Sequence, residues 1–599
     1  MLLSRRFWGL CGAALAVGAL AGLAGVAFRY LINGIEVFAF GEGITALSEG
    51  RLPEVSAREH NEFVSTQWGY AVVFVPLIGG LVVGLLRRLW PRTRTRGIAE
   101  VMAAVQAKGG ILHARTSWGH AILSAITVGT GGSTGREGPI AYIGASIGST
   151  LSRRWGFRPR DIKILVGCGF ASGVAATFNT PLGAVLLALE LVVPEFSTHA
   201  FIPLALATVA GIAASRYFLG GDVTFEVGGF QMVTMWELAM YLVLGVLCGL
   251  LSVVFIRLMV WTHRTWNGLR LPEEAKPAFG GLLVGLLGVG MYILFTGRGG
   301  YHVFGTGYGT VSALLQGSDL VMFLPLLLVL VIVKPLATSI TIGSGGGGGV
   351  FSASLYQGAL IGAIVGIVAD ALAPEIGIHP ASYALVGMGA FYAATARATL
   401  TAIVMIAELT NDFHSVLPVM FAAVSADAVS IALHKDSIYT VSLTRQGIRY
   451  EHDRVQSPLD VMQVKDVMSR RVQTVPAETK CFDAFVRMLD GGHTGYPVVD
   501  REGKLAGIIT RRDLSRIMQE DKGDLSVGEV VTGMTITAFP DELLARVRDR
   551  MHAQDIGRLV VVDPEDRRSI LGIITRSDIL HAESRGLAEA SEAEGAGPV

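Results

Sequence analysis

The sequence carries little charge for its length. Of its 599 residues, 16% are Asp, Glu, Lys or Arg, whereas 51% are hydrophobic and 75 are glycine. Soluble domains typically contain about 25% charged residues, so this composition excludes an ordinary soluble globular protein. The charged side chains balance one another, with 49 acidic and 49 basic residues. The net charge therefore gives no reason to expect a nucleic-acid partner.

Cysteines and clustered metal ligands are also scarce. The four cysteines are far apart in the sequence (Cys11, Cys168, Cys248 and Cys481). The histidines of the apolar part are equally scattered (His113, His120, His199 and His302). We therefore expect neither a disulfide nor a metal site, and we interpret the cysteines as small core residues. A membrane-embedded enzyme would need a nucleophile with a base, or a metal cluster, so we do not expect an enzyme.

Long apolar stretches are present instead, and they recur from about residue 9 to about residue 434. Most approach or exceed the roughly 20 residues that a membrane-spanning helix needs, which predicts a multi-pass membrane domain over residues 1–445. The first stretch continues to about Ile32, too long for a cleaved signal peptide, so we expect a retained helix. Arg5 and Arg6 precede the first stretch and Arg87 and Arg88 follow the second, which predicts that both termini are cytoplasmic.

A glycine-rich segment, residues 127–139, stands out within this apolar sequence. Pro139 is suited to the first turn of a helix, so a helix should begin near Gly138. The free amides of a helix N-terminus favour anions, yet Glu137 already occupies that place. An ionised side chain at membrane depth costs about 2.5–3.5 kcal/mol on insertion scales, so it calls for a function. The segment predicts an anion pathway that contains a carboxylate.

The glycine-rich segment has a second copy. TVGTGGSTGREGPIAYIGASIG at residues 127–148 aligns with TIGSGGGGGVFSASLYQGALIG at residues 341–362, with Thr127/Thr341, Tyr142/Tyr356 and most glycines identical. The segment ending at Glu190 similarly resembles the one ending at Glu408. We therefore expect two inverted-topology repeats, roughly residues 70–220 and 275–435, with broken re-entrant helices and a site at the membrane midplane.

The charged remainder of the chain contains a shorter repeat. GIITRRDL at residues 507–514 recurs as GIITRSDI at residues 572–579, each after a β-rich run. This pattern predicts two α/β units, residues 461–520 and 521–583, after a linker at residues 446–460. Residues 584–599 are rich in Ala, Glu and Gly, which is typical of a disordered tail.

These motifs together resemble the CLC family of chloride channels and proton-coupled chloride antiporters, followed by a pair of CBS domains. Residues 135–139, GREGP, match one family signature completely. The resemblance implies that Glu137 is the gate, competing with the anion and moving aside or becoming protonated when an anion passes. The anion-binding residues that it implies come from three signatures and the last helix: Arg96, Gly97, Gly135, Arg136, Gly138, Gly349, Val350, Phe351 and Tyr439.

Three departures from the family pattern affect the predicted ion selectivity and coupling. Arg96 replaces a serine that usually touches the central anion, and Ala353 replaces a proline. Leu191 stands where the antiporters have a proton-passing glutamate, although Glu190 or Glu195 could substitute for it. We therefore predict passive, channel-like anion transport, with chloride as the first candidate. An antiporter of protons with chloride, fluoride or nitrate is the alternative.

The CBS resemblance implies a site for ATP, ADP or AMP. The residues that match the family pattern are Thr510, Asp513, Thr575 and Asp578. Each acidic residue also fits a plain helix N-cap, so both readings stay open. No cofactor is expected to be required for transport. The family resemblance also implies a homodimer with one pathway per subunit in the cell membrane.

Two further classes deserve comparison with an anion transporter. A nucleotide-sensing regulatory protein with a membrane anchor would leave the matched glycine segments and Glu137 unexplained. A divalent-cation transporter should show carboxylate clusters along its pathway, whereas these segments favour anions. Glu408 is expected to act structurally, as a hydrogen-bond partner between helices.

Overall fold

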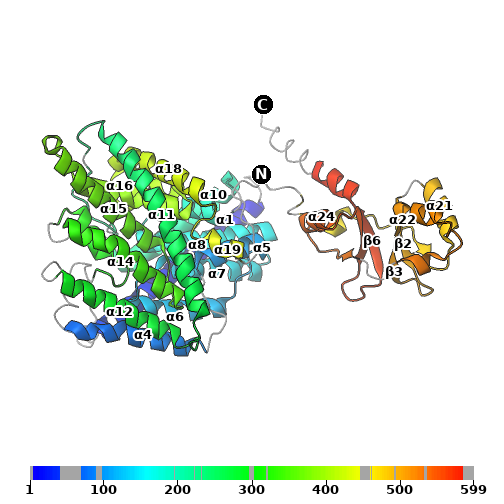
Figure 1. Cartoon of the computed structure of the whole chain (residues 1–599), viewed down its shortest axis with the longest axis horizontal. Coiled ribbons are helices and arrows are strands. Elements are labelled where there is room, and N and C mark those ends of the chain that lie inside the picture. The colour runs from blue at the N-terminus through cyan, green and yellow to red at the C-terminus, as the bar shows by residue number, and fades with distance from the viewer. Residues whose placement is uncertain are drawn as a thin grey trace. The chain divides into compact units, whose positions relative to one another are not determined.

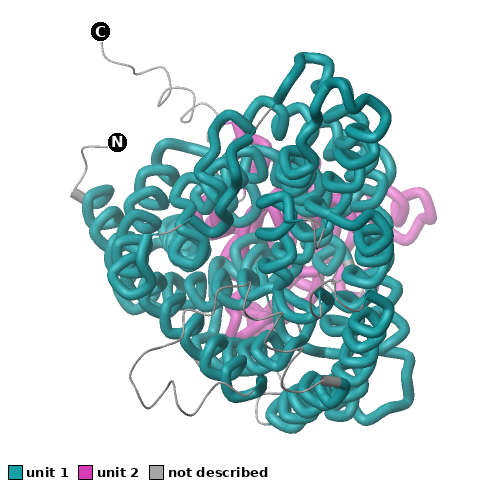
Figure 2. Tube along the Cα trace, turned by 90° about the vertical axis from the view of Figure 1, so that its left-hand side faces the viewer, with its two compact units in different colours: residues 1–451 teal, residues 452–599 magenta. Residues whose placement is uncertain are grey.

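The computed structural model describes residues 5–40, 69–88, 97–193, 196–221, 223–230, 232–295, 302–318, 322–445, 459, 462–491, 494–531 and 536–584. The chain forms two compact units, residues 1–451 and 452–599 (Figure 2). Arg96, Glu195, most of the predicted linker and residues 585–599 lie outside the described residues.

The first unit is helical throughout its described residues (Figure 1). Its first half contains α1 (Arg5–Phe40), a 3₁₀ turn (Gly69–Val73), α4 (Phe74–Leu86), α5 (Ile98–Ala107), α6 (Ala114–Gly129), α7 (Glu137–Arg154), α8 (Pro159–Phe178), α9 (Pro181–Leu191) and α10 (Thr198–Leu219). Its second half contains α11 (Glu237–Gly268), α12 (Lys276–Leu294), α13 (Tyr308–Leu315), α14 (Leu324–Gly343), α15 (Phe351–Leu372), α16 (Pro380–Ala396), α17 (Thr399–Thr410), α18 (Val416–Leu433) and α19 (Thr440–Arg445). Eight helices of the described residues are long and apolar enough to cross a membrane.

Matching helices in the two halves pack against matching partners. Helix α1 packs against α6, α7, α8 and α10, and α11 packs in the same way against α14, α15, α16 and α18. Each repeat therefore begins one long helix earlier than the predicted starts near residues 70 and 275. The sequence did not indicate these earlier starts, because α1 and α11 pack against matching helices but have no sequence motif in common.

Helices α9 and α17 are broken at matching positions. Asn179 and Arg397 end the preceding helices in the left-handed conformation, with φ of 57° and 60°. The helices that follow have 11 and 12 residues, well short of the roughly 20 residues that a spanning helix needs. These are the short, interrupted helices that the duplicated sequence predicts.

The two short helices hold each other through their carboxylates. Glu190 on α9 accepts hydrogen bonds from the backbone amides of Leu400 and Thr401, at 3.0 and 2.8 Å. Glu408 on α17 accepts hydrogen bonds from the backbone amides of Leu182 and Gly183, at 3.0 and 2.7 Å. Each carboxylate thus satisfies free amides at the N-terminus of the other helix. This confirms the structural role expected of Glu408 and gives Glu190 the same role.

The second unit contains two matching three-stranded sheets. In each, the first two strands are parallel and the last two are antiparallel. The first sheet contains β1 (Val475–Pro476), β2 (Gly495–Val499) and β3 (Leu505–Thr510), with α21 (Cys481–Asp490) and α22 (Arg511–Gln519). The second contains β4 (Thr537–Ala538), β5 (Arg558–Val562) and β6 (Ile570–Thr575), with α24 (Leu544–Ala553) and a helix at residues 576–584. Helices α20 (Val464–Val467) and α23 (Val527–Val530) complete the unit.

The two α/β units of the C-terminal part exchange their first helices. Val464 of α20 is buried with Leu544 and Leu559 in the core of the α/β unit that contains β4–β6. Val527 of α23 is buried with Val475 in the core of the α/β unit that contains β1–β3. The predicted boundaries at residues 461, 520 and 583 therefore follow the sequence repeat but not the packing, because each repeat contributes its first helix to the other core.

The two sheets are also joined directly. Leu505 of β3 donates its backbone amide to the carbonyl of Arg568 at 2.8 Å, and Leu505 packs against Val560 and Val562 of β5. Lys504 forms an ion pair with Asp566, and this hydrogen bond holds the pKa of Asp566 below its usual range. The CBS pair is therefore a single packed module.

Candidate functional site

The two glycine-rich segments pair with each other at aligned residues. The Gly135 amide donates to the Gly349 carbonyl at 2.9 Å, and the Gly349 amide donates to the Gly135 carbonyl at 2.7 Å. The result is an isolated antiparallel bridge between the two repeats. An antiparallel pair in which each residue faces its own counterpart relates the two repeats by an approximate two-fold rotation.

Two threonines make a second reciprocal set of hydrogen bonds. The Thr127 hydroxyl accepts a hydrogen bond from the Gly347 amide at 3.0 Å. The Thr341 hydroxyl accepts one from the Ser133 amide at 3.2 Å. Both donors occupy aligned positions, and both threonines are identical in the sequence repeat. The duplicated residues therefore build one paired backbone in the middle of the membrane domain.

Glu137 begins α7 next to this paired backbone, and its residue is only 2% exposed. The Tyr308 hydroxyl donates a hydrogen bond to Glu137 Oε1 at 2.5 Å. The Ser352 hydroxyl donates to Glu137 Oε2 at 3.5 Å. A Cβ atom on Gly135 would lie 1.9 Å from Oε2, so a glycine is needed for the carboxylate to fold back in this way. The buried carboxylate thus lies between the two repeats, held by hydroxyls of the second.

Tyr308 lies in the centre of an aromatic and basic group. The Arg136 guanidinium carbon lies 5.4 Å from the centroid of the Tyr308 ring, within cation–π distance. The Phe225 and Phe178 rings make edge contacts with it, with centroids at 5.3 and 6.4 Å. Neither Tyr308 nor Ser352 was predicted as a site residue: Tyr308 belongs to no motif that the sequence made visible, and Ser352 lies within the second glycine-rich segment but carried no predicted role.

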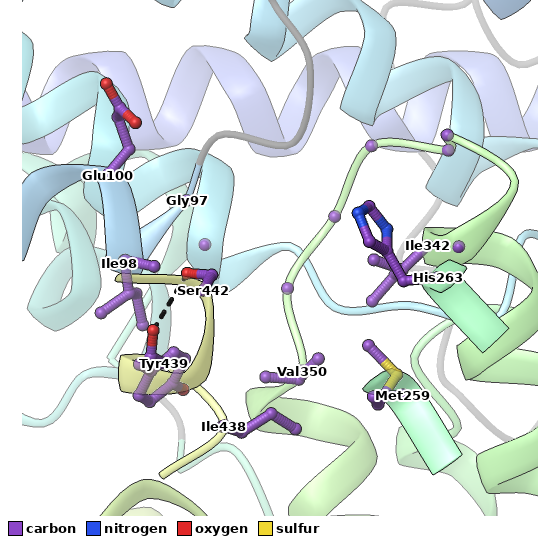
Figure 3. Close-up of a pocket in the computed structure, with 18 of the residues that line it drawn as sticks. Gly97, Ile98, Glu100, Met259, His263, Ile342, Val350, Ile438, Tyr439 and Ser442 are labelled. Carbon is purple, nitrogen blue, oxygen red and sulfur yellow. Dashed lines mark hydrogen bonds between the residues drawn. The ribbon is translucent and has the colours of Figure 1, made fainter. Parts of the chain in front are cut away.

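A cavity of about 340 Å³ is lined in part by the second glycine-rich segment, at residues 345–349. Six predicted anion-binding residues line it: Gly97, Gly138, Gly349, Val350, Phe351 and Tyr439. In Figure 3 the Tyr439 side chain lies beside Ile98, while Met259 and His263 come from the other side of Val350. Gly135 and Arg136 are not lining residues, and Arg96 lies outside the described residues.

Helix N-termini supply much of the cavity wall. Gly97 is the N-cap of α5, and Val350 is the N-cap of α15. The Tyr439 hydroxyl is buried and interacts with the hydroxyl of Tyr392. Backbone amides at helix starts suit an anion because they offer partial positive charge, and the cavity lining also includes the cationic Arg87.

The two described positions that depart from the expected family pattern, Ala353 and Leu191, are buried. Ala353 lies in the first turn of α15, next to Ser352. Leu191 is the last residue of α9, and an aliphatic side chain cannot carry a proton. Glu190 precedes it, but its oxygens accept the amides that begin α17. Glu190 therefore already has a structural task.

The four predicted nucleotide residues form two matching capping boxes. Asp513 Oδ2 accepts hydrogen bonds from the Thr510 hydroxyl and amide, at 2.5 and 3.1 Å. Asp578 Oδ2 accepts the corresponding bonds from Thr575, at 2.7 and 2.8 Å. The plain helix-cap interpretation of these residues is thus realised in the structure, and it leaves ligand binding open.

Arg558 brings the two capping boxes toward the same end of the CBS pair. It pairs with Thr575 across the second sheet, and its Nη1 donates to the Gly495 carbonyl at 2.9 Å. Gly495 in turn pairs with Thr510 across the first sheet. A cation therefore lies close to both predicted threonines.

The fold and site define a class of protein: a helical membrane transporter built from two related halves that meet around helix N-termini. A family model described as voltage gated chloride channel matches residues 79–431, and a CBS domain model matches residues 464–520 and 527–585. The chain belongs to the voltage gated chloride channel family, the CLC family, and carries a pair of CBS domains. It is an anion transport protein of the membrane.

Individual relatives agree with this assignment. A ClcB-like chloride channel protein of Ralstonia nicotianae is 32% identical over 439 residues, covering 72% of this chain and 95% of the relative. The chloride channel protein CLC-f of Arabidopsis thaliana is 26% identical and covers 90% of this chain and 78% of its own length.

Solved structures show the same fold. A slow cyanobacterial Cl⁻/H⁺ antiporter matches with a TM-score of 0.63 and 25% identity, covering 74% of this chain and 98% of that one. A eukaryotic CLC transporter matches with a TM-score of 0.57 and 20% identity, and it covers 95% of this chain and 97% of its own.

Proposed function

We propose that the protein conducts chloride or a related anion through one pathway in each subunit of a homodimer, with Glu137 as the gate. The observation that carries this proposal is the buried Glu137 carboxylate beside a cavity lined by helix N-termini. We infer that an ionised carboxylate at the start of α7, next to the lining residue Gly138, competes with an anion for the partial positive charge of the helix N-termini. Protonation or displacement of Glu137 removes that competition, so the anion can pass.

We further propose that transport is channel-like, with little or no stoichiometric proton movement. Leu191 replaces the proton-passing glutamate implied by the family pattern, and Glu190 is engaged by the N-terminus of α17. Moving a proton through Glu190 would require breaking these hydrogen bonds. The described residues therefore favour conduction over coupled exchange.

Proton-coupled antiport is the second candidate, because two structural neighbours are a Cl⁻/H⁺ antiporter and a fluoride/proton antiporter. The two candidates separate when chloride and proton fluxes are recorded together from purified protein in liposomes. Channel-like transport predicts chloride flux without proton flux along an imposed chloride gradient. A fixed ratio of protons to chloride would instead establish antiport. Fluoride and nitrate as competitors would show which anion the cavity prefers.

We also propose that an adenine nucleotide binds to the CBS pair near Arg558 and the two capping boxes. This site would be cytoplasmic, on the side that the basic residues flanking the first two helices assign to both termini. ATP, ADP and AMP titrated against the full-length protein by calorimetry test this proposal, with Arg558→Ala as the variant. Heat that is lost in the variant supports it, and an absence of heat in the parent protein rejects it.

A further inference from the structure

The Tyr308 hydroxyl makes the shortest hydrogen bond to Glu137, the proposed gate, and Tyr308 belongs to the opposite repeat. Its hydrogen bond to Glu137 Oε1 is 2.5 Å long, and the Tyr308 ring is confined by Arg136, Phe178 and Phe225. A confined donor that faces a carboxylate stabilises both its charge and its position, because hydrogen bonds to ionised acceptors are the stronger ones.

The backbone that carries Tyr308 is itself fixed by an unusual set of contacts. The buried Lys334 amino group donates to the carbonyls of Val303, Phe304 and Gly305, at 2.9, 3.4 and 3.0 Å. The Tyr356 hydroxyl donates to the preceding carbonyl, that of His302, at 3.1 Å. Four consecutive carbonyls are thus held by two side chains of α14 and α15. Lys334 is 1% exposed in the middle of α14, and these carbonyls satisfy its buried amino group.

This fixed loop leads directly into the gate contact. Gly307 has a φ of 79°, and a Cβ atom there would lie 2.4 Å from the Tyr356 ring. Tyr308 follows as the first residue of α13. The loop therefore determines where the Tyr308 hydroxyl lies, and thereby where Glu137 rests.

We propose that Tyr308 is the positioning residue of the gate: it holds the ionised Glu137 carboxylate in the closed position and so sets the pH at which the pathway opens. This inference rests on the proposed function of Glu137. Release of the carboxylate requires loss of the Tyr308 hydrogen bond. A proton on Glu137 weakens that bond, since a neutral acid is a poorer acceptor than a carboxylate.

The other groups near Glu137 do not duplicate this role. The titratable or charged side chains that interact with it are Arg136 on its own segment, Tyr308 on α13, Tyr392 on α16 and Tyr439 near α19. Ser352 on α15 is neutral, and its hydroxyl is 3.5 Å from the carboxylate. Among the described residues, only Tyr308 makes a hydrogen bond of 2.5 Å to Glu137.

The test is the pH dependence of chloride flux in Tyr308→Phe, which removes the hydroxyl and keeps the ring. The half-maximal pH should move upward by about one to two units, the size expected for one hydrogen bond to a charged group. Tyr383→Phe is the matched control, because it removes a buried tyrosine hydroxyl that interacts with Glu237 and not with Glu137. Its pH profile should match that of the parent protein.

The Glu137→Ala background separates a gate effect from a packing effect. With the carboxylate absent, Tyr308→Phe should change flux by less than about two-fold, since interaction energies vanish when one partner is removed. A lower flux with an unchanged half-maximal pH, or an equal effect in both backgrounds, would overturn the role of Tyr308. If Glu137→Gln alters the pH profile while Tyr308→Phe leaves it unchanged, the gate stands and this inference fails. An unchanged profile in Glu137→Gln would reject the gate itself.

Discussion

The two repeats share their backbone contacts and differ in the side chains that meet between them. Thr127 and Thr341 make the same hydrogen bond, and Gly135 and Gly349 form one bridge. Two residues after these glycines, however, the first repeat has Glu137 and the second has Phe351. The duplication thus provides a symmetric arrangement of helix ends, and the gate arises where the symmetry is broken.

A second asymmetry supports the same conclusion. His120 of α6 makes an edge contact with the Tyr142 ring, with centroids 5.7 Å apart. At the aligned place in the second repeat, the Lys334 amino group lies 5.0 Å from the Tyr356 ring centroid. The second repeat thus acquired a long basic side chain that reaches the loop before Tyr308. One repeat supplies the carboxylate, and the other supplies the residues that hold it.

The largest expected loss of stability comes from placing a methyl group on Gly349, one of the two paired glycines. A Cβ atom on Gly349 would lie 2.8 Å from the Gly138 backbone nitrogen, which cannot move easily. Gly349→Ala should therefore destabilise the protein by about 1–3 kcal/mol or more and reduce the yield of folded protein. Size-exclusion chromatography and thermal unfolding measure this loss.

Gly135→Ala should behave differently, although it lies at the aligned position. Its Cβ atom would meet the Glu137 carboxylate and the Ser352 hydroxyl, both movable side-chain groups. We expect a folded protein with about ten- to a hundred-fold more chloride flux at neutral pH, corresponding to one lost hydrogen bond to a charged group. Equal loss of folding in both variants would contradict the asymmetry.

An intermediate effect is expected at the two carboxylates that cap each other's helices. Glu190→Ala and Glu408→Ala should each lower stability by about 1–2 kcal/mol, the usual cost of a lost N-cap. The thermal shift should be somewhat larger for Glu190→Ala, because both carboxylates accept two backbone amides but Glu190 also accepts the Thr401 hydroxyl. Any proton flux should be unchanged in Glu190→Ala. A proton flux lost in this variant alone would show that Glu190 carries protons.

The smallest expected effect belongs to the matched threonines. Thr127→Val and Thr341→Val each remove one hydroxyl acceptor and should cost about 1 kcal/mol. Thermal unfolding of both variants and of the double variant would measure the two effects. A large effect for one threonine and none for the other would indicate that the symmetric contacts are unequal in strength.

Much of this arrangement could be predicted from the sequence. The repeated glycine segments predicted that the two halves meet, and GREGP placed Glu137 at the start of a helix. Such predictions succeed because a glycine, a proline or a charged residue within apolar sequence indicates where the backbone turns or a helix begins. The same information predicted the short helices α9 and α17.

The residues that hold Glu137 could not be predicted in this way. Tyr308 lies 171 positions from Glu137 in sequence, and only the meeting of the two halves brings their side chains together. Lys334 carried a usable signal, since a lysine within a 20-residue apolar helix is costly and calls for a partner. The helix exchange between the CBS units could not be predicted, because the sequence repeat suggests that each unit is one contiguous segment.

The gate is tested most directly by chloride flux from Glu137→Gln in liposomes over a range of pH. The amide keeps the size of the side chain and mimics the protonated carboxyl group, so it cannot compete with an anion as a charge does. We predict that flux at neutral pH rises above that of the parent protein and no longer depends on pH. Flux that stays at the parent level and keeps its pH dependence would contradict the assignment of Glu137 as the gate.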